Sequence, residues 1–99
     1  MTRLQIQSDT KESALDLIRS AITAEVSRLE FGLKATERHI RLFEQRYRVS
    51  SDVFLRDFSA EDLTDGDREY VAWAGELRLR ERITSALETL QGIQYAAYA

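Results

Sequence analysis

Apolar residues repeat at helical spacing over the first half of the chain. Between residues 9 and 48 they follow the alternating steps of a heptad repeat, and no proline interrupts the series. This pattern predicts one long helix with a continuous packing seam, in which Arg19 and Thr36 are the polar positions. The seam consists of Leu15, Ile22, Val26, Leu29, Leu33, Ile40, Phe43 and Tyr47. We expect it to form the core of the molecule or a dimer contact.

A second apolar row runs along a neighbouring face of the same helix. It contains Leu17, Ala21, Ala24, Phe31, Ala35 and Leu42. A helix that packs against one neighbour needs one apolar stripe, so two stripes indicate contacts with two neighbours. Leu17, Phe31 and Leu42 are the large residues of this row, and we expect them to contact a partner protein.

Two further helices follow in the second half. Ser50 is a good N-cap residue for a short helix over residues 51–58. A longer helix is expected over residues 67–91, and Gly92 can end it. The inward positions of the two helices should form the core of a helical hairpin. They are Phe54, Phe58, Tyr70, Trp73, Leu77, Ile83 and Leu87.

The ends of the chain carry weaker patterns. In residues 1–8, Leu4 and Ile6 alternate with polar residues, which fits either a brief strand or a loose N-terminal arm. The uncharged residues 92–99 fit either a frayed tail or a partner contact. No internal repeat or linker divides the chain, so residues 1–99 are expected to form a single helical domain.

The helix lengths predict more apolar surface than one chain can cover. About 38 helical residues extend over roughly 57 Å, whereas a compact chain of this length has a diameter of roughly 35 Å. The predicted fold is therefore all-α, a long helical hairpin of a long, a short and a long helix that dimerises into a four-helix bundle. The alternative is a break at Gly32 into two stacked segments. A glycine costs only about 1 kcal/mol within a helix, which is too little to break a packed one.

Composition and charge disfavour several classes of function. The 99 residues include 14 Lys or Arg, 17 Asp or Glu, one His and no Cys, for a net charge of -3. Such a chain offers no disulfide, no thiolate metal site and little scope for Ser–His–Asp chemistry. No apolar run reaches the roughly 18 residues of a membrane span, and the acidic balance disfavours nucleic-acid binding. We expect a cytoplasmic protein without enzymatic activity, metal or cofactor.

The charged clusters have structural explanations. His39 lies among arginines and fits an exposed helix residue. The acidic stretch that contains Asp62 and Asp65 lacks the spacing of a calcium loop. It fits helix capping, although its carboxylates can also attract a basic partner. The arginines late in the long helix, or the N-terminal arm, leave DNA binding open as an alternative.

A longer motif spans the turn between the two long helices. Its residues are Phe43, Tyr47, Ser50, Ser51, Phe54, Phe58, Leu63, Tyr70 and Trp73. This pattern resembles a family of small all-helical prokaryotic antitoxins encoded beside TumE-type toxins. Arg48 stands where that family has a turn glycine, and residues 59–65 are a longer form of its acidic turn. The resemblance covers roughly residues 40–90 and implies a dimeric antitoxin that sequesters a toxin.

The sequence therefore predicts a non-enzymatic protein-interaction module, and the resemblance implies the antitoxin of a type II toxin–antitoxin pair. The candidate contacts with the toxin are Leu17, Phe31, Leu42, Asp62 and Asp65. Two alternatives remain open: a homodimeric structural or assembly protein, and a DNA-binding regulator.

Overall fold

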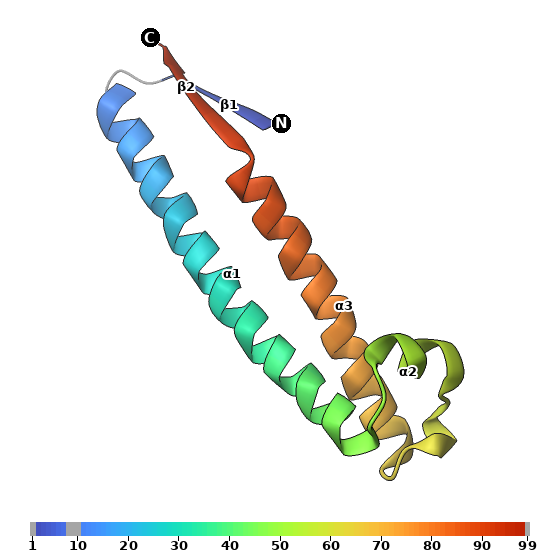
Figure 1. Cartoon of the computed structure of the whole chain (residues 1–99). Coiled ribbons are helices and arrows are strands. Elements are labelled where there is room, and N and C mark those ends of the chain that lie inside the picture. Colours follow the sequence, from blue (N-terminus) through green and yellow to red (C-terminus); the bar gives the residue numbers. More distant parts are fainter. Residues whose placement is uncertain (1, 8–10, 99) are drawn as a thin grey trace.

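The computed structural model describes residues 2–7 and 11–98 and contains three helices and two strands in this part of the chain. In chain order the elements are β1 (Thr2–Gln7), α1 (Lys11–Tyr47), α2 (Ser51–Asp57), the 3-10 turn η1 (Ala60–Asp62), α3 (Gly66–Gln91) and β2 (Ile93–Tyr98). Helices α1 and α3 lie side by side as an antiparallel hairpin, and α2 lies across one end of it (Figure 1). The molecule is elongated and measures 61 × 20 × 18 Å.

The helical hairpin predicted from the sequence is confirmed, but the all-α fold class needs a correction. β1 and β2 pair as a parallel two-stranded sheet, in register from Thr2 opposite Ile93 to Gln7 opposite Tyr98. Residues 2–7 thus form a strand rather than a loose N-terminal arm, and residues 93–98 form a strand rather than a frayed tail. Local periodicity gave little sign of this pairing because the two strands come from opposite ends of the chain. The predicted helix start at residues 9–10 lies outside the described residues.

Helix α1 is continuous, so Gly32 does not divide it. A Cβ atom at Gly32 would lie 3.6 Å from Ile83 Cδ1, an ordinary contact distance, which places α3 close to α1 at this point. The predicted seam of α1 packs within the chain: Ile40 and Thr36 are buried, and the other seam residues except Arg19 are half-buried. Arg19 is exposed.

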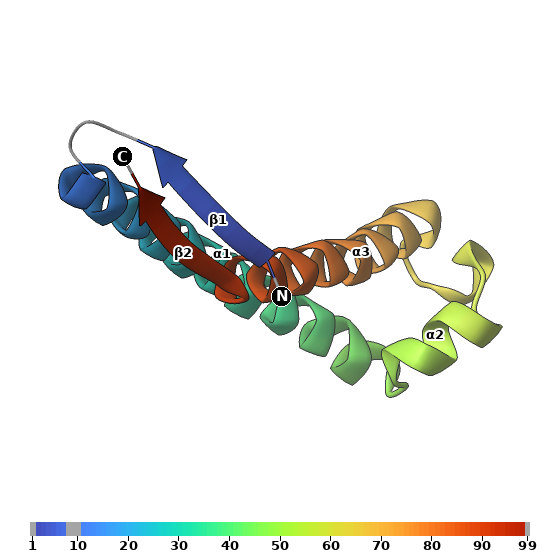
Figure 2. The ribbon, with the colours of Figure 1, turned by 90° about the horizontal axis from the view of Figure 1, so that it is seen from above.

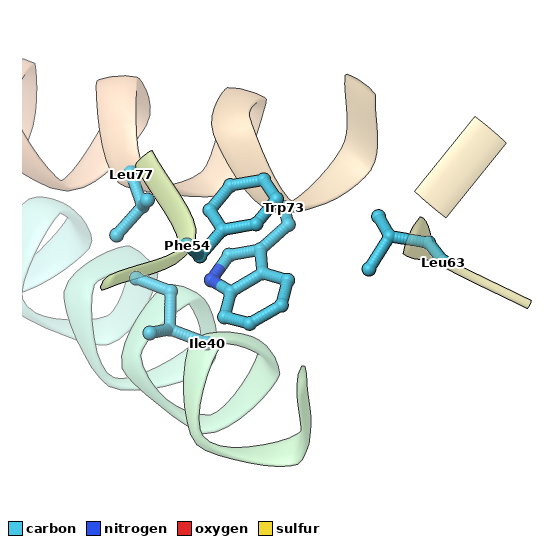
Figure 3. Packing of buried hydrophobic residues seen from close by; sticks show 5 residues of the cluster. All are labelled: Ile40, Phe54, Leu63, Trp73 and Leu77. Carbon is cyan, nitrogen blue, oxygen red and sulfur yellow. The ribbon is translucent and has the colours of Figure 1, made fainter. Parts of the chain in front are cut away.

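One aromatic stack joins all three helices at the end that α2 covers. The fully buried ring of Trp73 from α3 stacks on Phe54 from α2, with centroids 3.9 Å apart, and on Phe43 from α1, at 5.3 Å. Ile40, Leu63 and Leu77 complete this core (Figure 3). Stacked aromatic pairs add attraction beyond the burial of their area, so this cluster is the main packing centre of the hairpin.

Buried polar groups in the same region are paired across the helices. Trp73 Nε1 donates to Ser51 Oγ at 3.0 Å, and Ser51 Oγ donates to Glu44 Oε2 at 2.8 Å. The backbone N–H of Ser51 donates to the same carboxylate oxygen at 2.9 Å. Ser50 supplies the N-cap of α2, since its hydroxyl accepts from the Val53 N–H. The two serines of the predicted turn therefore have different tasks, capping for one and core pairing for the other.

Glu69 organises the turn before α3. Its buried carboxylate accepts from Tyr47 Oη at 2.6 Å and from the Asp65 N–H at 2.7 Å, and Arg46 Nη1 lies 3.0 Å from its second oxygen. Tyr47 Oη in turn accepts from the Thr64 N–H. The hydrogen bond from Tyr47 is the main cause that lowers the pKa of Glu69. The end of α1 and the start of α3 are thus joined through one charged group.

Arg48 follows the end of α1, at the position where the pattern that this sequence resembles has a turn glycine. Arg48 has φ 56°, in the left-handed region, and the Val49 N–H donates to the Glu44 carbonyl. This is the Schellman arrangement, in which glycine is the usual left-handed residue. Arg48 adopts the conformation that the glycine of the family pattern would favour.

Candidate functional site

The second apolar row of α1 is largely exposed. We call it the outer row; it consists of Leu17, Ala21, Ala24, Phe31, Ala35 and Leu42. The exposed fractions of its large side chains are 71% for Leu17, 81% for Phe31 and 60% for Leu42. The seam on the same helix is buried or half-buried against the rest of the chain. The outer row is therefore the apolar surface of α1 that the hairpin itself does not cover.

Two arginines interrupt the heptad spacing of the outer row, at positions 28 and 38. Arg28 forms a bidentate pair with Glu25, with Nε 2.6 Å from Oε1 and Nη2 2.7 Å from Oε2. The hydrogen bond from Arg28 lowers the pKa of Glu25, and the same bond raises the pKa of Arg28. The charge of Arg28 is thus paired within α1. Phe31, three residues further on, is the large exposed apolar side chain at the middle of the outer row.

A cavity of about 370 Å³ opens where Leu42 meets α3. Its lining consists of His39, Leu42, Phe43, Arg46, Ala72 and Glu76. His39 Nδ1 lies 3.2 Å from Glu76 Oε1, so this pair connects α1 to α3. Glu76 Oε2 is buried and has no hydrogen-bond partner among the described residues.

The sequence did not single out this cavity or the exposed Val71 beside it. Val71 precedes the cavity residue Ala72 on α3, and its side chain is 69% exposed. A signal existed, because Val71 is out of phase with the inward series of Tyr70, Trp73 and Leu77. The pairing of His39 with Glu76 had no such signal, since the two residues belong to different helices.

The two predicted acidic contacts lie elsewhere, in the loop between α2 and α3. Asp62 accepts from the Ser59 N–H at 2.8 Å and so caps η1. Asp65 Oδ2 lies 3.7 Å from Arg68 Nε. Both carboxylates are exposed, at the end of the molecule that α2 covers (Figure 1). The structure does not bring them together with Leu17 and Phe31, which lie in the first two thirds of α1.

The residues predicted for the hairpin core are placed inside. Phe54, Trp73, Leu77, Ile83 and Leu87 are buried, and Phe58 and Tyr70 are half-buried. They support the fold rather than form a site.

In residues 2–7 and 11–98, no three acidic or histidine side chains converge on a point where a metal ion would fit. Within the same residues, no helix has both the length and the apolar character needed to cross a membrane. Comparisons of the chain with protein-family models, with curated proteins and with solved structures find no match.

Proposed function

We propose that this chain is a non-enzymatic protein-interaction module that acts as the antitoxin of a cytoplasmic toxin–antitoxin pair. One observation carries the interaction role: three large apolar side chains of the outer row are 60–81% exposed along a single helix. Surfaces of this kind on soluble proteins mark contacts with other proteins. The toxin is proposed to cover this row.

The shape of the row suits recognition of a helix in a groove. An apolar stripe on a rigid helix is a common peptide-like ligand for a hydrophobic groove. Phe31 lies between Leu17 and Leu42 and has the properties of a central anchor, since aromatic residues at the centre of an interface often dominate binding. Burial of each of these side chains contributes about 1.5–3 kcal/mol, before the costs of association.

The cavity beside Leu42 adds a polar preference to this apolar contact. Glu76 Oε2 lacks a donor, and Arg46 and His39 line the same cavity. A lysine or arginine of the toxin placed over the cavity would be attracted to the negative charge of Glu76. The exposed carboxylates of Asp62 and Asp65 favour the same choice, because they attract a basic surface from a distance.

The antitoxin assignment itself rests on the sequence resemblance. The motif residues that carry it, among them Phe43, Phe54 and Trp73, build the packed end of the hairpin. The outer row lies mostly before this motif. The class of partner is thus inferred from the resemblance, whose residues build the scaffold. The place of contact is inferred from the exposed outer row.

Co-expression with the open reading frame that neighbours the gene of this protein tests the proposal. Wild-type protein is expected to relieve growth inhibition, and Phe31→Asp is expected to lose this effect because it places a charge at the centre of the apolar contact. Leu55→Asp is the matched control, since Leu55 is an exposed leucine on α2, outside the row. If wild-type protein gives no relief, the antitoxin assignment is wrong. If Phe31→Asp protects as well as wild-type protein, the outer row is not the contact.

A further inference from the structure

The sheet formed by β1 and β2 has fewer strands than a sheet usually needs to be stable by itself. It contains two strands in the described chain, so each strand has one neighbour and one outer edge without a neighbouring strand. Isolated two-stranded sheets are marginal in water, and parallel pairs are slightly less stable than antiparallel ones. β1 and β2 lie side by side (Figure 2). Ile6 is only 7% exposed, so one face of β1 is covered, whereas Arg3 and Gln5, which alternate with it, are exposed.

The two outer edges differ in protection. Proteins protect free edges with charged residues and prolines, which oppose pairing with another chain. β1 contains Arg3, whereas β2, with the sequence Ile-Gln-Tyr-Ala-Ala-Tyr, contains neither a charged residue nor a proline. The edge of β2 is therefore the one open to a further strand.

We propose that β2 pairs in antiparallel orientation with β2 of a second copy of this chain, to give one four-stranded sheet of order β1–β2–β2–β1. A neutral strand can lie opposite itself without any like-charge contact. A two-fold axis closes the interface after two chains, because each copy uses the same edge. The strands left at the outside are then the two copies of β1, which contain the protecting Arg3. This inference uses a surface distinct from the outer row and does not rest on the proposed toxin contact.

The connection of α3 to β2 fixes the shape of such a dimer. α3 leads into β2 through Gly92, so antiparallel β2 strands direct the two helical hairpins to opposite ends of the shared sheet. Each chain is 61 Å long and the six-residue strands overlap by about 20 Å, which gives a dimer about 100 Å long. Two chains packed side by side along α1 would remain close to the length of one chain.

Ala96 is the position at which the strand contact is tested best. It aligns with Gln5 in the backbone register of β1 and β2. In a symmetric antiparallel pair, a residue and its copy share a face, because the two-fold axis is perpendicular to the sheet. Ala96 lies next to the centre of β2, so it is opposite its own copy or two positions from it. Like charges placed there repel across the axis, and opposite charges attract.

The experiment measures the dimerisation of the full chain by analytical ultracentrifugation and its length by small-angle X-ray scattering. Wild-type protein is expected to be a dimer about 100 Å long. Ala96→Lys and Ala96→Glu are each expected to weaken the dimer about fivefold, and an equimolar mixture of the two variants is expected to restore it. Phe31→Asp is the control and should leave the dimer unchanged, and circular dichroism verifies that every variant keeps its helices.

Three results would overturn this inference. The first is a wild-type monomer at micromolar concentration, which would leave the edge of β2 to another partner such as the toxin. The second is a dimer that is no longer than one chain. The third is a pair of Ala96 variants that dimerise as well as wild-type protein. The loss of toxin protection in Phe31→Asp has no bearing on any of these outcomes, so the two proposals fail separately.

Discussion

The two ends of the hairpin are stabilised by different means. At one end, which we call the closed end, α2 and η1 cover the neighbouring ends of α1 and α3, and the ring of Trp73 contacts rings from both other helices. At the other, the strand end, β1 and β2 lie over the first part of α1 (Figure 2), with Ile6 as the one buried side chain of the described sheet residues 3–6 and 93. The closed end holds three helices together within one chain, whereas the strand end joins the two ends of the chain through a backbone ladder.

This difference separates the tasks of the two ends. A cluster in which aromatic stacking, hydrogen bonds and a charged pair all join the same helices unfolds as one unit. A two-stranded sheet is marginal by itself, so it opens at lower free energy. The closed end therefore fixes the angle of the hairpin and holds the last part of the outer row, at Leu42, in a rigid form. The strand end keeps a backbone edge available for assembly.

The largest expected effect comes from Trp73→Ala at the closed end. The side chain is fully buried, and it supplies both the aromatic stack and the donor to Ser51 Oγ. Its removal is expected to cost about 3–5 kcal/mol, a large share of the stability of a domain of this size. Urea denaturation followed by circular dichroism measures the loss. A cost below that of a typical exposed residue would show that the closed end is not the packing centre.

Ile6→Ala applies the same kind of deletion to the strand end. We expect a cost of about 2 kcal/mol, at the low end of the range for buried isoleucine, because a thin sheet can relax around the lost atoms. The effect should also be local: amide exchange in β1 and β2 should become faster, while exchange around Trp73 should stay unchanged. If amide exchange became faster by the same factor at both ends, the molecule would open as one unit, and the two ends would not differ in stability.

The sequence predicted the closed end better than the strand end, for a physical reason. Helical periodicity reports local burial, so it identified the seam and the inward positions such as Phe54 and Trp73. The parallel pairing of β1 with β2 is non-local, and no spacing within either segment reveals the other strand. The buried roles of Ser51 and Glu69 were also missed, since their partners Trp73 and Tyr47 lie on other helices. For the candidate site, the pattern gave the outer row, but it did not give the cavity at Glu76.

A pH titration tests the charged part of the closed end. The pKa of Glu69 is lowered from the ordinary value of 4.5, first by the hydrogen bond from Tyr47. A carboxylate with a lowered folded pKa adds stability that is fully present above the unfolded value and is lost as the pH falls through the folded value. Stability should therefore fall below pH 4.5, and Glu69→Gln should reduce the slope of this fall. Glu61→Gln, at an exposed position of η1, is the matched control. Equal slopes in the two variants would remove Glu69 as a source of the pH dependence.

The smallest effect is expected from Arg48→Gly, and it has the opposite sign. Arg48 has φ 56° at the Schellman end of α1, where its Cβ atom makes the left-handed conformation unfavourable. Glycine removes this cost but gains freedom in the unfolded chain, so we expect a net stabilisation of about 0.5–1 kcal/mol, or a rise of a few degrees in Tm. Arg48→Ala is the control, since it keeps the Cβ atom and should give no gain. If alanine stabilises as much as glycine, the arginine side chain rather than the backbone is the source of the cost. Because the closed end limits global unfolding, the gain from glycine should appear in Tm while amide exchange at β1 and β2 stays unchanged.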